Sequence, residues 1–237
     1  MNNLKRVLSL ALSGIMLVGM MAVGASAADF SDADKISNTD AVNTLVSLGV
    51  INGKDDGSFA PEEIVSRAQM CKMICVALNG GKEPTMGSGL IGTFNDVAKD
   101  NWAAPYIEYC VSEGIVGGVG GGRFNPTGNI TGTQAAKMLL CILGYNASIQ
   151  GYVGNDFWET KINVAAQKGL YDGLAGIDAS APLTRDQAAQ MIWNGLQAYE
   201  VEYITTLVPG PDGTLTSKVT VQDRYDSDLD SKITLLR

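Results

Sequence analysis

The sequence Val-Ser-Arg-Ala-Gln at residues 65–69 recurs as Ile-Thr-Gly-Thr-Gln at residues 130–134 and as Leu-Thr-Arg-Asp-Gln at residues 183–187. This spacing predicts a capping box, in which the hydroxyl accepts from the Gln backbone amide and the Gln side chain accepts from the cap residue's amide. Apolar residues then recur at helical spacing, so each copy predicts the start of an amphipathic helix. They are Met70, Met73, Ile74 and Ala77; Ala135, Met138, Leu139 and Ile142; and Ala188, Met191, Ile192 and Leu196.

A glycine followed by an aliphatic residue precedes each capping box. These pairs are Gly49-Val50, Gly114-Ile115 and Gly169-Leu170. A short apolar stretch ends at each glycine and predicts a first, shorter helix, so the chain contains three helix-loop-helix units. Because a unit of about 50 residues buries too little surface to fold alone, we expect the three units to pack into one all-α domain.

The N-terminus has the features of an export signal. Two basic residues, Lys5 and Arg6, precede an apolar stretch that closes on Ala-Ser-Ala at residues 25–27. The apolar stretch is nearly long enough to serve as a membrane anchor, but the small-residue ending and the acidic start at Asp29 favour cleavage after Ala27. We therefore expect residues 1–27 to be a signal peptide, and the mature chain to be secreted with no later membrane-spanning segment.

The remaining boundaries follow from the repeats. We assign residues 28–80 to the first unit, 81–93 to a linker, 94–145 to the second unit and 146–199 to the third. Residues 200–237 contain two weakly alternating segments on either side of Pro-Gly-Pro-Asp-Gly, which predicts a hairpin or a short extended linker tail.

Charge and composition exclude several functions. The net charge of −8 becomes −10 once Lys5 and Arg6 are removed, which argues against a nucleic-acid partner. The chain has no histidine, so imidazole-based catalysis and imidazole metal sites are excluded. We expect no enzyme, no cofactor and no metal.

Four cysteines remain, and the favoured interpretation is that all four are small buried hydrophobic residues. The alternative is a disulfide between Cys110 and Cys141, which are expected on two helices of one unit. The four are Cys71, Cys75, Cys110 and Cys141.

The three units resemble the S-layer homology (SLH) family, and the likeness covers about residues 30–198. The second unit carries most of the family pattern, and the first and third carry parts of it in the same order. The matching stretches are Phe94-Asn95-Asp96-Val97, Trp102-Ala103, Gly114-Ile115, Gly117-Gly118, Phe124-Asn125-Pro126 and Ile130-Thr131; Phe30-Ser31-Asp32, Gly49-Val50, Phe59-Ala60-Pro61 and Val65 to Gln69; and Trp158, Gly169-Leu170, Pro182 and Leu183 to Gln187.

The resemblance implies a pseudo-threefold helical assembly whose grooves hold an anionic secondary cell-wall polysaccharide, often one with a pyruvylated amino sugar. It implies that the arginine after the cap meets the carboxylate, while the early aspartate, the tryptophan and loop glycines shape the groove. In this chain those residues are Arg67, Arg185, Asp32, Asp96, Trp102, Trp158, Gly117 and Gly118.

The two arginines also point to anion binding on physical grounds. Arg67 and Arg185 follow directly after the cap residue, where a cation faces the positive end of the helix dipole. Free backbone amides beside a guanidinium are expected to form a compact site for a carboxylate or phosphate.

Departures from the family pattern limit the number of working grooves. Gly132 stands where an arginine is expected, so the groove of the second unit is either inactive or served by Arg123 or Lys137. The first unit has Ser37 at the position of Trp102, and in the third unit Phe157, not Trp158, aligns with Trp102. We therefore expect fewer than three working grooves.

The sequence thus predicts a non-enzymatic protein of the bacterial cell wall or S-layer. Its expected partner is a secondary cell-wall polymer or a peptidoglycan-linked glycan, with further S-layer copies as a second possibility. One alternative is a self-assembling S-layer or adhesion protein. A less favoured alternative is a small secreted glycoside hydrolase that uses two carboxylates.

Overall fold

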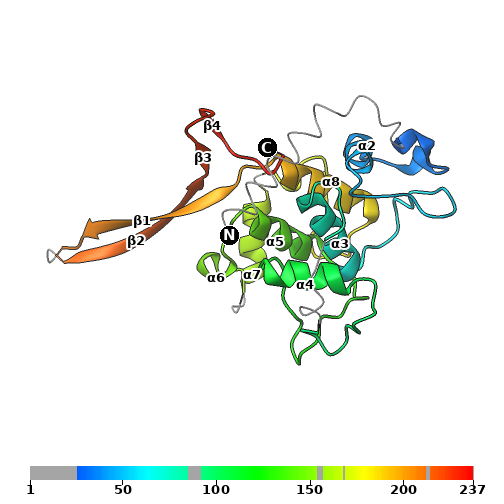
Figure 1. The fold of residues 1–237 in the computed structure, drawn as a ribbon. Helices are drawn as coiled ribbons and strands as arrows, with labels where there is room; N and C mark the ends of the chain where they lie inside the picture. Colours follow the sequence, from blue (N-terminus) through cyan, green and yellow to red (C-terminus); the bar gives the residue numbers. More distant parts are fainter. Residues whose placement is uncertain (1–25, 85–91, 154–156, 168, 212–213, 237) are drawn as a thin grey trace.

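The computed structural model describes residues 26–84, 92–153, 157–167, 169–211 and 214–236. It shows a mostly helical body from which a long antiparallel hairpin projects (Figure 1). The predicted signal peptide, apart from its last two residues, lies outside the described part. No described helix is long and apolar enough to cross a membrane.

The body contains three pairs of main helices and a few short helical turns. Each pair begins with a helix of nine residues, and its second helix has 11 to 13 residues. The pairs are α2 (Thr39–Ser47) with α3 (Arg67–Leu78), α4 (Ala104–Ser112) with α5 (Gly132–Ile142), and α7 (Trp158–Ala166) with α8 (Arg185–Gln197). The short elements are η1 (Ala27–Asp29), η2 (Ala33–Lys35) and α6 (Ala147–Gln150).

All three predicted capping boxes are confirmed. Ser66, Thr131 and Thr184 each accept from the backbone amide of the Gln three residues later, and that Gln side chain accepts from the cap residue's amide. The marker glycines that follow the first helices, Gly49 and Gly114, both have φ of 70°. A side chain would be strained in this left-handed conformation, so glycine allows the chain to leave the helix there.

Each second helix packs against the first helix of the following unit. Helix α3 contacts α4, α5 contacts α7, and α8 contacts α2, so the third unit returns to the first and the order of packing closes on itself. We name these three contacts the α3–α4, α5–α7 and α8–α2 junctions.

This packing places the cysteines differently from the pair considered in the sequence. Helix α4 lies on α3 of the preceding unit, and the Sγ of Cys110 is 3.7 Å from the carbonyl oxygen of Cys71. Cys110 and Cys141 form no disulfide, because all four cysteines are free thiols. The suggested Cys110–Cys141 pair was therefore wrong, since the helices that meet belong to different units.

A ring of backbone hydrogen bonds joins the three segments that lead into the second helices. The amide of Val65 donates to the carbonyl of Leu183, that of Leu183 to Ile130, and that of Ile130 to Val65, over 2.9 to 3.0 Å. These aliphatic residues precede the capping boxes, and all three side chains are buried. Each unit therefore contributes one edge of a shared centre, and the start of each second helix is fixed relative to the other two.

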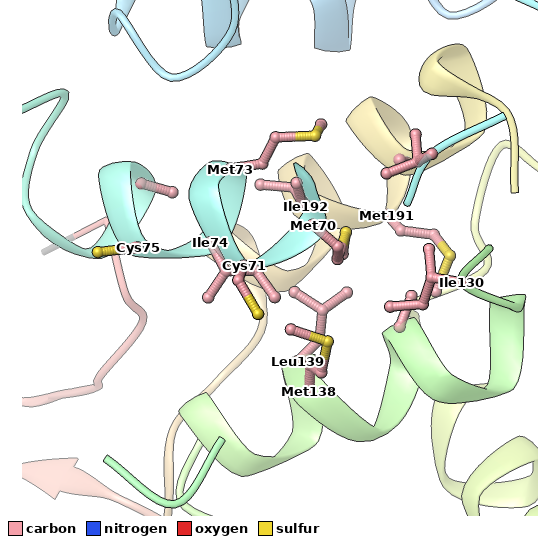
Figure 2. Close-up of a cluster of buried hydrophobic side chains, with 14 of the residues drawn as sticks. Met70, Cys71, Met73, Ile74, Cys75, Ile130, Met138, Leu139, Met191 and Ile192 are labelled. Carbon is pink, nitrogen blue, oxygen red and sulfur yellow. The ribbon is translucent and has the colours of Figure 1, made fainter. Parts of the chain in front are cut away.

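Side chains from the second helices fill the core around this ring. Figure 2 shows Met70 and Ile74 of α3, Leu139 of α5 and Met191 of α8 gathered in one cluster. The apolar positions predicted from helical spacing are nearly all buried, because three amphipathic helices turn their apolar faces toward one centre.

The C-terminal part corrects the all-α prediction. Strands β1 (Val201–Pro209) and β2 (Leu215–Asp223) pair antiparallel in a hairpin, and β3 (Tyr225–Asp226) pairs with β4 (Ser231–Lys232). The fold is therefore mostly helical with an antiparallel C-terminal region. The chain then returns to the body, where the amide of Leu236 donates to the carbonyl of Leu196 over 3.2 Å.

Candidate functional site

Arg67 joins the first unit to the loop of the second. Its Nε donates to the carbonyl of Phe124 and its Nη2 to the carbonyl of Gly117, each over 3.0 Å. The guanidinium also lies 4.5 Å from the centre of the Phe124 ring, close enough for a cation–π contact. Arg67 is only 9% exposed, so it is a buried clamp and not a solvated surface charge.

Arg185 makes the same contacts between the third unit and the first. Its Nε donates to the carbonyl of Phe59 over 2.9 Å and its Nη2 to the carbonyl of Asn52 over 3.0 Å. Its guanidinium lies 4.9 Å from the centre of the Phe59 ring. The two arginines therefore hold neighbouring units together in equivalent ways.

The prediction that free amides at these helix starts bind an anion was wrong. The amides of Arg67 and Ala68 donate to the carbonyls of Gly128 and Pro126, over 2.8 and 3.0 Å. Those of Arg185 and Asp186 are likewise taken up by residues of the first unit. These amides already donate to carbonyl groups of a neighbouring unit, so they are not available to an anion.

Asp32 and Asp96 stabilise the loops that the arginines grip. Asp96 accepts from the amides of Phe124 and Asn125, both over 2.8 Å, and Asp32 accepts from the equivalent amides in the first unit. Burial opposes ionisation, but these amides outweigh it and hold the pKa of both carboxyls below 3.8. The contacts of these carboxylates are with the loop backbone.

Gly117 and Gly118 serve two different purposes. A Cβ at Gly118 would lie 2.7 Å from a ring carbon of Phe94 and 2.8 Å from the carbonyl of Arg123, so this position requires glycine for packing. A Cβ at Gly117 would meet no atom within 4 Å. The backbone of Gly117 is therefore open to an approaching ligand, while its carbonyl receives Arg67.

A cavity of about 200 Å³ lies at the α5–α7 junction, beside the Arg67 clamp. Three elements contribute polar or aromatic groups to it: Arg67 from the start of α3, Lys137 from α5 and Trp158 from the start of α7. The loop after α4, including Gly117 and Gly118, forms another wall, and Ile115, Val116, Val119, Gln134 and Met138 complete the lining.

Lys137 gives this cavity its electrostatic character. Burial and the neighbouring charge of Arg67 lower the pKa of Lys137 below its ordinary value of 10.5, although Cys141 acts in the opposite direction. Two cations thus face one cavity, and of the ion pairs in the described part of the chain none includes Arg67 or Lys137. An anion entering the cavity would relieve their repulsion.

The ring of Trp158 forms an apolar face next to these cations. The Nζ of Lys137 lies 5.7 Å from the centre of that ring. An aromatic face beside two cations suits a sugar ring that carries an acidic substituent.

The structure brings Arg67, Trp158, Gly117 and Gly118 together and leaves the other predicted site residues elsewhere. Trp102 is 56% exposed and stacks near Tyr106 of α4, with ring centres 6.2 Å apart. Arg123 lies exposed on the outer loop and does not line the cavity. From the sequence, Lys137 was considered only as a substitute for the missing arginine. The signal that could have selected it is its position three residues after the capping-box glutamine, Gln134.

The α8–α2 junction is a poor anion site. Gly132 replaces the arginine of the other units, and its backbone packs so closely that a Cβ would lie 3.0 Å from the Cα of Ala179. A larger cavity of about 420 Å³ lies at this junction, with Lys35 facing three carboxylate residues. These are Glu62, Asp178 and Asp186. Its negative charge disfavours an anionic ligand.

The first two units are similar to a known protein family. Residues 29–71 and 93–136 match the family model of the S-layer homology domain. The matched ranges include Asp32, Arg67, Asp96 and Trp102, and the second ends near the middle of α5.

The curated relatives of this chain are much longer than the chain itself. The chain is 28% identical over 201 residues to an S-layer protein of Bacillus licheniformis, an alignment that covers 81% of this chain and 22% of the relative. It is 36% identical over 117 residues to a surface-layer 125 kDa protein of Lysinibacillus sphaericus, covering 48% of this chain and 9% of that relative. It is 30% identical over 164 residues to an uncharacterized cell wall amidase of Bacillus anthracis, covering 64% of this chain and 29% of that relative. The chain thus spans less than a third of these proteins.

Proposed function

Because residues 29–71 and 93–136 match the family model of the S-layer homology domain, we propose that this chain is a non-enzymatic cell-wall anchor that binds an anionic secondary cell-wall polysaccharide. Its location is the cell wall or surface layer, as the domain matches and the surface-layer relatives indicate. The observation that carries the proposal is the α5–α7 cavity, whose lining combines two cations, Arg67 and Lys137, with the ring of Trp158.

The third unit is part of the same proposal. Residues 146–199 form a third repeat, and the three repeats form a pseudo-threefold assembly. The closed order of helix packing and the ring formed by Val65, Ile130 and Leu183 support this. The threefold arrangement matters because the cavity is lined by residues of all three units, so no unit could form it alone.

The ligand of the cavity is a sugar bearing a carboxylate, such as the pyruvylated amino sugar implied by the family. A carboxylate fits between a lysine ammonium and a guanidinium edge as a charge-assisted hydrogen-bond acceptor. The pyranose ring would rest on Trp158. The net charge of −8 gives no general attraction for a polyanion, so affinity must come from this local pair of cations.

Co-sedimentation with cell-wall sacculi tests this function. The protein is expected to bind untreated sacculi and not sacculi stripped of secondary polymer by acid. Equal binding to both preparations would indicate peptidoglycan as the partner, and binding to neither would refute wall anchoring. Lys137→Gln should weaken binding to untreated sacculi, and the exposed Lys218→Gln of the hairpin serves as its control.

Assembly with further copies in a surface layer is a second candidate, favoured by the hairpin. Residues Tyr203, Val219 and Val221 share one face of the β1–β2 ladder with Leu207 and Leu215, and this face is largely exposed. An isolated two-stranded hairpin is marginally stable in water, so a partner would stabilise it. Self-association of the purified protein without polymer, measured by sedimentation velocity, would support this role.

The hydrolase alternative receives no support from the carboxylates first considered for it. Asp32 and Asp96 each accept two backbone hydrogen bonds and hold loops in two different units. Release of reducing sugar from purified walls would be the observation in its favour.

A further inference from the structure

The α3–α4 junction contains the same parts as the α5–α7 cavity. Arg185 grips the loop of the first unit there, as Arg67 grips the loop of the second. Lys72 stands three residues after the capping-box glutamine of α3, as Lys137 does on α5. The Nζ of Lys72 lies 5.2 Å from the centre of the Tyr106 ring on α4, which corresponds to Lys137 over Trp158.

The two junctions differ in the carboxylates around their cations. Glu83, just after α3 in the chain, places Oε1 3.4 Å from the Nζ of Lys72. Its Oε2 accepts a hydrogen bond from the hydroxyl of Tyr106. The carboxylate of Glu83 therefore contacts both Lys72 and Tyr106, the residues that would otherwise hold the carboxylate of an external ligand.

A second carboxylate lies near the arginine of this junction. Glu63 pairs with Lys54, and its pKa is lowered first by that hydrogen bond and further by the charges of Lys54 and Arg185. The equivalent position before the capping box of the second unit is Gly128, which carries no charge. At the α3–α4 junction Lys72 therefore has an ion-pair partner and Arg185 lies within the influence of the Glu63 charge. Neither cation of the α5–α7 junction has an ion-pair partner among the described residues.

We propose that Glu83 is a built-in carboxylate that occupies the anion position of the α3–α4 junction and so restricts external acidic sugars to the α5–α7 junction. The inference rests on the proposed function for the class of ligand. Because Glu83 is tethered only a few residues beyond α3, it competes as if present at a concentration on the order of millimolar or higher. A wall polymer therefore finds the α5–α7 junction open and the α3–α4 junction occupied by the Glu83 carboxylate.

Two tryptophans allow the junctions to be observed separately. Trp158 lines the α5–α7 cavity, and Trp102 lies beside Tyr106 at the α3–α4 junction. The chain has three tryptophans, so the indole N–H signals in a nitrogen–proton NMR spectrum can be assigned by single substitutions. We would titrate the full protein with polymer released from sacculi and, separately, with sodium malonate as a small dicarboxylate.

In the wild-type protein, either ligand should shift the Trp158 signal and leave that of Trp102 unchanged. In Glu83→Gln and in Glu83→Ala, both signals should shift, and the number of bound polymer chains should rise from one to two. Adding Lys72→Gln to Glu83→Gln should abolish the new Trp102 shift. Glu113→Gln, which removes an exposed carboxylate at the end of α4, should behave like wild type.

A Trp102 shift of equal size in wild type, or its absence from both Glu83 variants with both ligands, would overturn the proposal. If malonate opens the Trp102 response in the variants but polymer shifts neither tryptophan in any protein, polymer binding fails while the role of Glu83 stands. If polymer shifts Trp158 in every protein and neither ligand shifts Trp102 in any, polymer binding stands and the role of Glu83 fails.

Discussion

The Nζ of Lys137 lies 5.7 Å from the centre of the Trp158 ring, although the two residues belong to different repeat units. The lysine comes from the second helix of one unit and the tryptophan from the first helix of the next. The contact exists because α5 packs on α7. The binding cavity is therefore a product of the junction between units.

Lys137→Gln should weaken binding to wall polymer by about 10- to 100-fold. A hydrogen bond to a charged group contributes about 1.5–3 kcal/mol, and Gln is a polar side chain one atom shorter that lacks the charge. Co-sedimentation at several protein concentrations measures the change, and the melting temperature should remain near that of wild type. An equal loss in Lys218→Gln would mean that total charge matters and the cavity does not.

Polymer binding should decline as the pH rises through the lowered pKa of Lys137, at a lower pH than an ordinary lysine would cause. Only the ammonium form attracts the carboxylate, so binding is accompanied by proton uptake in this range. The folding stability of the free protein should follow the opposite trend. The pKa of Lys137 is lower in the folded chain than in the unfolded chain, so the free energy of unfolding rises as the pH increases from the lowered pKa toward 10.5. Isothermal titration in two buffers tests the first point. Lys137→Arg should flatten the pH dependence, and an unchanged profile would contradict the role of Lys137.

Arg67→Ala should destabilise the fold by about 2–4 kcal/mol, because two loop carbonyls and a cation–π contact lose their partner. Denaturant unfolding measures this loss. Arg67→Lys keeps the charge but lacks the guanidinium fork, so it should lie between wild type and Arg67→Ala. A fully stable Arg67→Ala protein would show that the clamp contributes little to holding the units together.

Gly132→Ala should lower stability by about 1–2 kcal/mol. The added Cβ would lie 3.0 Å from the Cα of Ala179 and 3.2 Å from its carbonyl oxygen, and overpacking typically costs about 1–3 kcal/mol. The better helix preference of Ala offsets up to about 1 kcal/mol of this. Gly117→Ala is the matched control, since its Cβ meets no atom within 4 Å. Equal effects on the melting temperature would contradict close packing at Gly132.

Cys71, Cys75 and Cys110 should resist alkylation in the folded protein. All three are buried, and burial raises the pKa of Cys75 to about 12, so thiolate is scarce at neutral pH. Mass spectrometry after iodoacetamide treatment should show labelling of these sites only in denaturant. Recovery of four reactive thiols in denaturant without reductant is also expected, and recovery of two would indicate a disulfide.

Sequence alone determined the local features of the repeats. Ser66, Thr131 and Thr184 form their capping boxes, and Gly49 and Gly114 end the preceding helices, as the pattern predicted. These features depend on residues within a few positions of one another. Hydrogen bonding at a helix start and the left-handed backbone of glycine need no knowledge of the rest of the chain.

Only the tertiary structure decided which helices meet and what the charged residues do there. An apolar stripe on α4 could pack equally well on α5 of its own unit or on α3 of the preceding one, so the sequence left a Cys110–Cys141 disulfide open as an alternative. The same long-range packing turned Arg67 into a clamp, brought Lys137 to Trp158 and placed Glu83 on Lys72. Such contacts arise from the closure of three units around a common centre, and helical periodicity carries no information about that closure.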